Sequence, residues 1–194
     1  MSYLLTPLGV SVLALLRQRP MHGYEMFQTL TNRRDARIVK VRPGSLYHVV
    51  ARLAEEDLIR STATGRDGNR PERTIFEITQ AGVDALTSGV RDLVATPVNE
   101  FPRFVAGLAE LDNLDRASAV AAVRSRVAAL EADLADLATG SASGDTPAMH
   151  LSALDYLTAT TRTKLDWLRE FADSLESGRV GWRDEAVRPS EVVL

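Results

Sequence analysis

Two groups of side chains in the first half of the chain could hydrogen-bond to nucleic acid. The first group lies around one short segment and comprises Arg42, Gly44, Ser45, Tyr47, His48 and Arg52. Hydroxyl, imidazole and guanidinium groups can pair with base edges, and small residues such as Gly44 and Ala51 let a helix approach a groove closely. The second group consists of three arginines near a turn, Arg66, Arg70 and Arg73, whose charge suits phosphate oxygens.

The first group is expected on a helix that begins at Pro43. Its apolar residues recur at the i, i+3, i+4, i+7 spacing of one buried helix face: Leu46, Val49, Val50 and Leu53. Pro43 suits a first helical turn, where its missing N–H costs nothing. The polar group would then face outward. An ordinary amphipathic helix with a solvated outer face is the alternative for this segment taken alone.

A β hairpin is expected directly after this helix. Residues 58–63 and 74–78 have the composition of two strands, and Gly65, Asp67-Gly68-Asn69 and Pro71 between them favour turns. The three arginines crowd the tip of this hairpin. A merely solvated surface would explain them, but next to a polar helix we favour phosphate or minor-groove contact. Helix and hairpin together predict a winged helix-turn-helix with a two-stranded β wing.

Two further helices are expected upstream. Thr6-Pro7 predicts a capped start for a helix that runs through Leu16 and is apolar almost all round, so it should pack on more than one side, beyond its own small domain. A second helix is expected to start at Met21, with Tyr24, Phe27 and Leu30 as its core contacts. Between residues 33 and 52 there are six basic residues and one acidic residue, a local net charge of +5.

Three motifs follow one another over the first 82 residues. They are Pro20-Met21-His22-Gly23-Tyr24-Glu25, Gly44-Ser45-Leu46-Tyr47-His48-Val49 with Arg52-Leu53, and Arg70-Pro71-Glu72-Arg73-Thr74 ending in Ile78-Thr79-Gln80-Ala81-Gly82. In this order they resemble the signature of PadR-type transcriptional regulators. The resemblance implies a dimeric DNA-binding protein, usually a repressor and sometimes relieved by a small molecule. Asn69 departs from it, because a glycine commonly precedes the Arg-Pro pair.

The second half is expected to be helical, and it resembles the extended C-terminal region of one PadR subfamily, notably at Lys164-Leu165-Asp166-Trp167-Leu168. Thr79 predicts a cap for a helix through Ala95, and Asp115 opens a helix to Ala138. That helix carries a heptad seam formed by Val120, Val123, Val127, Leu130, Leu134 and Leu137. After a polar loop, a further helix should run to a stop at Gly178 and pack antiparallel to it. The seam could close this pair within one chain, but we favour a dimer.

Four aromatic residues form a candidate effector site in this half: Phe101, Phe104, Trp167 and Phe171. They could stack a small planar or aromatic ligand at a dimer interface, although aromatic residues at helical spacing are more often plain core. The three histidines, His22, His48 and His150, lack metal-ligand spacing and the chain has no cysteine, so we expect neither a metal sensor nor a cofactor. No catalytic motif indicates an enzyme.

The expected architecture is mainly α-helical. It comprises a winged helix-turn-helix DNA-binding domain at 1–95, a helical dimerisation and effector domain at 96–178 and a loose tail at 179–194. Residues 1–90 carry a net charge of +3 and residues 91–194 a net charge of −6. This division is consistent with a basic DNA-binding domain joined to an acidic C-terminal domain. Neither a signal peptide nor a membrane span is predicted, so we expect a cytoplasmic protein.

These expectations define a dimeric, sequence-specific regulator that binds double-stranded DNA at an inverted repeat. Repression relieved by an effector is favoured over constitutive DNA binding. A winged-helix module that binds protein partners through the same surface is the alternative.

Overall fold

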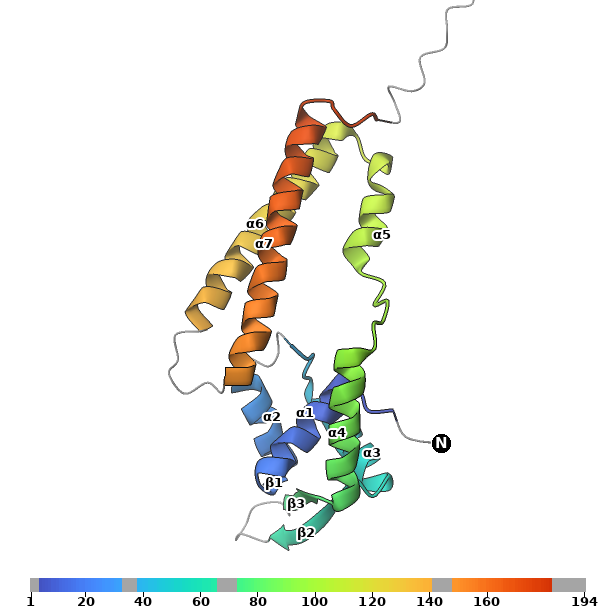
Figure 1. Cartoon of the computed structure of the whole chain (residues 1–194), viewed down its shortest axis with the longest axis vertical. Coiled ribbons are helices and arrows are strands. Elements are labelled where there is room, and N and C mark those ends of the chain that lie inside the picture. Colours follow the sequence, from blue (N-terminus) through green and yellow to red (C-terminus); the bar gives the residue numbers. More distant parts are fainter. Residues whose placement is uncertain (1–3, 33–37, 66–72, 141–147, 183–194) are drawn as a thin grey trace, which may run out of the picture. The chain divides into compact units, whose positions relative to one another are not determined.

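The computed structural model describes residues 4–32, 38–65, 73–140 and 148–182, and the chain forms two compact units, residues 1–99 and 100–194. The first unit combines four helices with three short strands (Figure 1). In chain order these are α1 (Pro7–Gln18), β1 (Met21–His22), α2 (Gly23–Asn32), α3 (Pro43–Glu55), β2 (Ile59–Gly65), β3 (Arg73–Ile78) and α4 (Gln80–Ala95).

Helix α1 is the centre of the first unit. Thr6 caps it as predicted, because its Oγ accepts a hydrogen bond from the backbone N–H of Gly9 at 3.1 Å. Val12 and Leu13 are fully buried, and the helix contacts α2, α3, α4 and β3. The expectation that α1 is buried on several sides is therefore confirmed. These contacts all lie within the first unit, so the further expectation that α1 packs against something beyond its own small domain stays a prediction.

The sheet contains one strand that was not predicted. Its order is β1-β3-β2 and all pairs are antiparallel, with Met21 opposite Phe76 and Ile59 opposite Ile78. The expected hairpin is thus present, with an irregularity in the register between Ser61 and Ala63. Met21 and His22 form the short strand β1, at the position where a helix had been expected to begin.

Helix α2 therefore begins two residues later than predicted, at Gly23, and its core face differs. Met26 and Leu30 are buried, Phe27 is partly buried, and Tyr24 is 54% exposed. The prediction of Tyr24 as a core contact was wrong. Met26 and Leu30 lie four residues apart on one helix face, which leaves Tyr24 on the side that faces away from the core.

The start of α4 is fastened to the turn between α3 and β2. Thr79 caps α4 as predicted, and its hydroxyl also donates to the carbonyl oxygen of Asp57 at 2.8 Å. The backbone N–H of Thr79 donates to the carbonyl oxygen of Leu58 at 3.1 Å. A Cβ at Gly82 would come within 2.1 Å of that same oxygen, so only glycine permits this approach.

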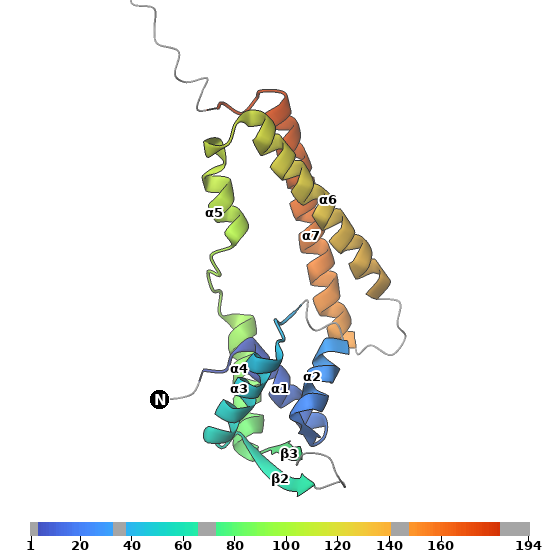
Figure 2. The same cartoon turned by 180° about the vertical axis from the view of Figure 1, so that it is seen from behind.

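The second unit consists of helices. They are α5 (Arg103–Ala109), the 3₁₀ turn η2 (Leu111–Asn113), α6 (Arg116–Gly140) and α7 (Ala148–Glu176). Helices α6 and α7 lie side by side and antiparallel, as Figures 1 and 2 show. Asp115 caps α6, because its Oδ1 accepts from the backbone N–H of Ser118 at 2.8 Å. Hydrogen bonds from the hydroxyl and backbone of Ser118 lower the pKa of Asp115.

The heptad seam of α6 closes against α7 of the same chain. Val123 and Val127 are buried in one cluster with Leu165 and Leu168, and the seam residues Val120, Leu130 and Leu134 pack partly against that cluster. Arg124 links the same two helices through Asp173 at 2.7 Å and Glu176 at 3.0 Å, and these hydrogen bonds raise its pKa. The intrachain interpretation of the seam is thus correct for these residues.

The C-terminal end of α7 is followed by a packed segment. Gly178 ends the helix at a φ of 71°, with the backbone N–H of Arg179 donating to the carbonyl oxygen of Ser174 at 3.0 Å. Trp182 is buried, and its Nε1 donates to the carbonyl oxygen of Leu114 at 3.0 Å. The expectation of a loose tail is therefore wrong for residues 179–182, while residues 183–194 lie outside the described part.

Within the described ranges, no helix combines the length and apolar character that crossing a membrane requires.

Candidate nucleic-acid interface

Helix α3 presents the predicted polar face to solvent. Leu46 and Leu53 are fully buried and Val49 and Val50 nearly so, which fixes one side of the helix to the core. The opposite side is exposed and carries the predicted residues Gly44, Ser45, Tyr47, His48 and Arg52, while Arg42 is exposed just before the helix. A Cβ at Gly44 would have no neighbour within 4 Å, so the first turn of α3 is open to an approaching molecule.

Tyr47 is held against the junction of β1 and α2. A Cβ at Gly23 would lie only 2.8 Å from Cε1 of Tyr47, so the absence of a side chain at Gly23 leaves room for the ring. The ring is nevertheless 52% exposed and can contact a partner. Sequence reasoning named both residues, but the contact between them joins segments 24 residues apart and has no local signal.

The junction of β1 and α2 is itself ordered by polar contacts. The Nδ1 atom of His22 accepts a hydrogen bond from the backbone N–H of Glu25 at 3.0 Å. The Glu25 carboxylate in turn accepts from the guanidinium of Arg19, and that hydrogen bond is the largest cause of the lowered pKa of Glu25. These contacts fix the start of α2 beside the exposed face of α3.

Arg52 is engaged within its own helix. Its guanidinium lies 3.3 Å from Glu55 and 2.9 Å from Glu56, so two carboxylates already compete for its hydrogen bonds. A contact between Arg52 and a phosphate would have to replace these exposed ion pairs. Because exposed ion pairs contribute little to stability, such an exchange would cost little free energy.

The sequence predicts three arginines at the tip of the wing. Arg66 and Arg70 lie outside the described residues, as does Asn69, and Arg73 opens β3 opposite Gly65 with its side chain undescribed. On the strands themselves, Arg60 pairs with Glu77 directly across the ladder at 2.5 Å. The structure therefore places the two strands that carry the tip, and the role of the three arginines stays a prediction.

Three of the four candidate effector residues lie together in the second unit. The rings of Trp167 and Phe171 are stacked with centroids 4.9 Å apart, and Phe104 meets Trp167 edge-on at 6.5 Å. The guanidinium of Arg126 covers Phe104 at 4.0 Å. Phe101 is instead 81% exposed. The three rings pack against one another. Trp167 is 46% exposed, so its outer side is the accessible part of the cluster.

Among the residues that the structure describes, no group of three or more histidine, aspartate or glutamate side chains is arranged to hold a metal ion. Of the three histidines, the side chain of His150 is not described.

The helix, the three-stranded sheet and the exposed polar face together define the class of the first unit, which is a winged helix-turn-helix. Residues 12–88 match the model of the transcriptional regulator PadR-like family, so the chain carries a PadR-like domain over this range. Among curated proteins, none matches the chain in sequence.

Several solved structures share this fold. Bacillus subtilis PadR in complex with operator DNA matches with a TM-score of 0.72 and 18% identity, over 88% of this chain and 99% of that one. Bacillus subtilis PadR in complex with p-coumaric acid matches with a TM-score of 0.70 and 17% identity, over 87% and 98% of the two chains. A PadR-like transcriptional regulator from Bacillus cereus matches with a TM-score of 0.62 and 18% identity, over 90% and 99%. Likeness at these identities concerns the fold.

Proposed function

We propose that this protein is a dimeric, sequence-specific DNA-binding transcriptional regulator whose α3 enters the major groove. The observation that carries this proposal is the exposed face of α3, on which Ser45, Tyr47 and His48 stand opposite a fully buried apolar face. A helix of this kind can present hydrogen-bonding groups to base edges without losing its own packing. The PadR-like domain and the likeness to a fold found bound to operator DNA support it.

The wing is proposed to bind the DNA backbone. Strands β2 and β3 leave the core next to α3 and lead to the segment that contains Arg66, Arg70 and Arg73. Phosphate contacts fix the position of a protein on DNA, and each one adds to the salt dependence of binding. The local net charge of +5 between residues 33 and 52 supports the same orientation toward the duplex.

Two variants separate base reading from phosphate binding. Tyr47→Ala should weaken operator binding by about 1–3 kcal/mol and relax the sequence preference, with Tyr47→Phe as the control that keeps the ring. Arg70→Ala should weaken all sequences alike and reduce the salt slope by about 1. Arg103→Ala, an exposed change in the second unit, should leave the slope unchanged. Fluorescence anisotropy with operator and random DNA over a salt series measures both effects.

If Arg70→Ala changed only the preference for operator over random DNA, the proposal that the wing binds the DNA backbone would be contradicted. Absence of any salt-dependent DNA binding would favour the alternative, a module that binds protein partners.

We further propose that the protein acts as a repressor that a small planar ligand releases from DNA, in line with the fold neighbour in complex with p-coumaric acid. The exposed side of Trp167, with Phe104 and Phe171 beside it, is the proposed contact surface. In a Trp182→Phe background Trp167 is the only tryptophan, so a releasing compound should change its fluorescence. Trp167→Ala should abolish release by a compound that changes this fluorescence, and should keep DNA binding. Unchanged release in that variant would place the effector elsewhere.

A further inference from the structure

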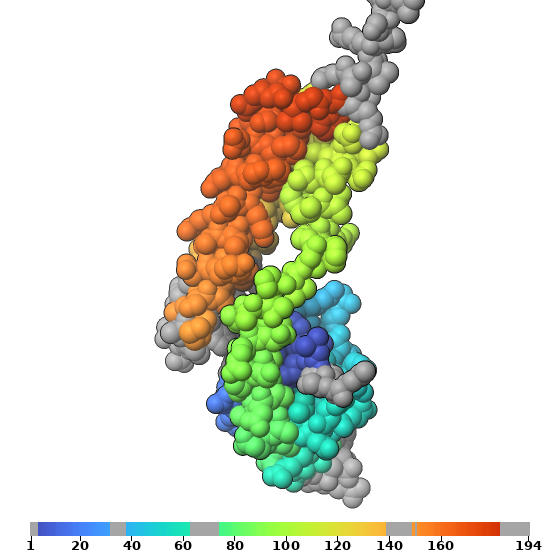
Figure 3. Space-filling model, turned by 45° about the vertical axis from the view of Figure 1, so that its right-hand side comes forward, coloured from blue at the N-terminus to red at the C-terminus, as the bar shows by residue number. Residues whose placement is uncertain are grey.

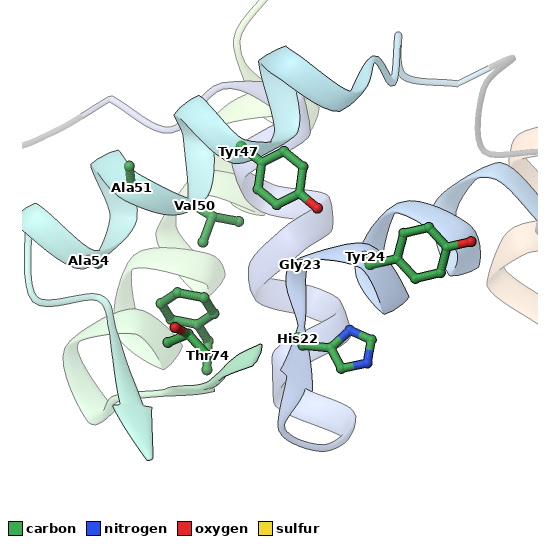
Figure 4. A pocket seen from close by; sticks show the side chains of 9 residues that line it. His22, Gly23, Tyr24, Tyr47, Val50, Ala51, Ala54 and Thr74 are labelled. Atoms are coloured by element: carbon green, nitrogen blue, oxygen red, sulfur yellow. The ribbon is translucent and has the colours of Figure 1, made fainter. Parts of the chain in front are cut away.

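A cavity of about 500 Å³ lies beside α3 in the first unit (Figure 4). Four residues of α3 line it at the i, i+3, i+4, i+7 spacing of one helix face: Tyr47, Val50, Ala51 and Ala54. This face lies between the core-facing side of the helix and the polar side proposed to meet DNA. The opposite walls come from the junction of β1 and α2 and from β3. The volume is within the range of small-molecule sites in proteins.

The cavity combines an apolar wall with several aromatic rings. Val50, Ala54 and Phe76 belong to or pack on the hydrophobic core, so they form a fixed surface. Tyr47, Tyr24 and His22 add three rings to the lining, and the rings of His22 and Tyr24 are 6.5 Å apart at their centroids. Aromatic rings pack best against other flat rings, either offset or edge-on. This lining suits a planar ligand of one or two rings.

The polar groups at the rim offer hydrogen bonds without a fixed charge. Because Nδ1 of His22 accepts from the backbone of Glu25, the proton of the neutral ring is assigned to Nε2, which can donate. The Tyr24 oxygen accepts from Gln28 Nε2 at 2.9 Å and keeps its own hydrogen to donate. Thr74 adds a hydroxyl. Neither a carboxylate nor a lysine or arginine is among the described lining residues, so an uncharged ligand with an oxygen acceptor fits best.

We propose that this cavity is a second ligand site, for an uncharged planar aromatic molecule of one or two rings bearing a hydroxyl group. The proposal rests in part on the proposed DNA function, since it also implies direct competition. Tyr47 and Ala51 belong both to the cavity wall and to the solvent-exposed surface of α3. A ligand held there fixes the Tyr47 ring and stands between α3 and the groove, so release of DNA needs no movement between the two units.

The first experiment measures binding to the free protein by isothermal titration calorimetry with 2-naphthol, whose two fused rings carry one hydroxyl group. The wild type should bind one equivalent per chain. Ala54→Leu fills part of the cavity and should weaken binding at least about tenfold. Thr74→Val is nearly isosteric, keeps the fold and should weaken binding severalfold through loss of one hydroxyl. Ala121→Leu, an exposed change on α6, should leave the affinity unchanged.

The second experiment measures operator release, in which 2-naphthol should displace DNA from the wild type but not from Ala54→Leu. The cavity would be ruled out as a ligand site if 2-naphthol showed no saturable binding, or if both Ala54→Leu and Thr74→Val kept the wild-type affinity. Saturable binding lost in Ala54→Leu without any DNA binding by the wild type would contradict the proposed function and the competition, and would leave the cavity established as a ligand site. Binding at the cavity with DNA retained would overturn the competition.

Discussion

Three glycines in the first unit show how single residues set the geometry of the candidate interface. Gly82 admits the carbonyl oxygen of Leu58, Gly23 admits the ring of Tyr47, and Gly44 has open space where its side chain would be. The first two are required by the fold of the free protein. The third has no such requirement, so any role of Gly44 must lie in what approaches α3 from outside.

Gly44→Ala should therefore leave the thermal stability of the protein unchanged or slightly raised, since alanine favours a helix. Its added methyl group should still weaken operator binding, because it stands where α3 would approach the groove. Differential scanning calorimetry and anisotropy measure the two effects on the same sample. Full operator affinity in Gly44→Ala would show that the first turn of α3 stays away from the DNA.

Gly82→Ala should have the opposite outcome. The added Cβ would lie 2.1 Å from a backbone oxygen, so α4 and the turn after α3 must move apart. We expect a loss of at least about 2 kcal/mol in the free energy of unfolding. Urea denaturation followed by circular dichroism gives this value, with Gly44→Ala as the matched glycine-to-alanine control. Wild-type stability in Gly82→Ala would contradict the close approach.

At the scale of elements, the second unit depends on a segment that follows its last helix. Arg116 donates to the carbonyl oxygens of Leu175 at 3.0 Å and Val180 at 3.1 Å, and its guanidinium lies 5.5 Å from the centroid of the Trp182 ring. The start of α6 and the end of α7 are thus joined through residues 180–182. The buried Trp182 ring fills the end of the helix pair.

Trp182→Ala should lower the free energy of unfolding of this unit by about 3 kcal/mol, as expected for removing a buried tryptophan. Trp182→Phe keeps most of the buried area and loses the hydrogen bond to Leu114, so it should cost about 1 kcal/mol. Chemical denaturation monitored by the fluorescence of Trp167 distinguishes the two variants. Equal stability of wild type and Trp182→Ala would show that this segment does not hold the helices together.

Assembly of two copies of the chain would need apolar surface that the fold leaves uncovered. The heptad seam is used within the chain, so aspartate at Leu130 or Leu134 would disrupt the helix pair and would not report on a dimer. Apolar side chains remain exposed on the first half of α7, where Met149 is 77% and Tyr156 is 69% exposed. They lie seven residues apart on one helix face and form a candidate surface for a second copy. Further exposed apolar side chains, those of Val90, Leu93 and Val94, lie on α4, which runs along the surface of its own unit (Figure 3).

We expect the wild type to sediment at twice its chain mass of 21.2 kDa at micromolar concentration. Met149→Asp combined with Tyr156→Asp should give monomers, because charges would be buried without partners. Ala121→Asp, an exposed change on α6, serves as the control. A two-fold dimer should protect an inverted repeat with half-sites centred about 10–10.5 bp apart or a multiple of it. A monomeric wild type, or protection of a single half-site, would contradict this assembly.

Features that depend on neighbouring residues could be predicted from the sequence. Helix α3 and its buried face, the two wing strands, the caps at Thr6, Thr79 and Asp115 and the stop at Gly178 were all predicted correctly. Hydrophobic period, side-chain caps and left-handed glycines act within a few residues, so their signals are present in the chain as it is read.

Features that join distant segments depend on tertiary packing and could not be predicted from local patterns. Strand β1 forms because Met21 and His22 pair with β3. Trp182 is held by its hydrogen bond to Leu114 and by the guanidinium of Arg116 over its ring. An apolar helix face shows that the helix needs a packing partner without showing which one. From the sequence, the seam of α6 could therefore pack either on a second chain or on α7 of the same chain. The cavity beside Tyr47 likewise arises where α3, the start of α2 and β3 meet, and each contributes residues that are unremarkable alone. Packing between remote elements selects one arrangement among several that the local pattern permits.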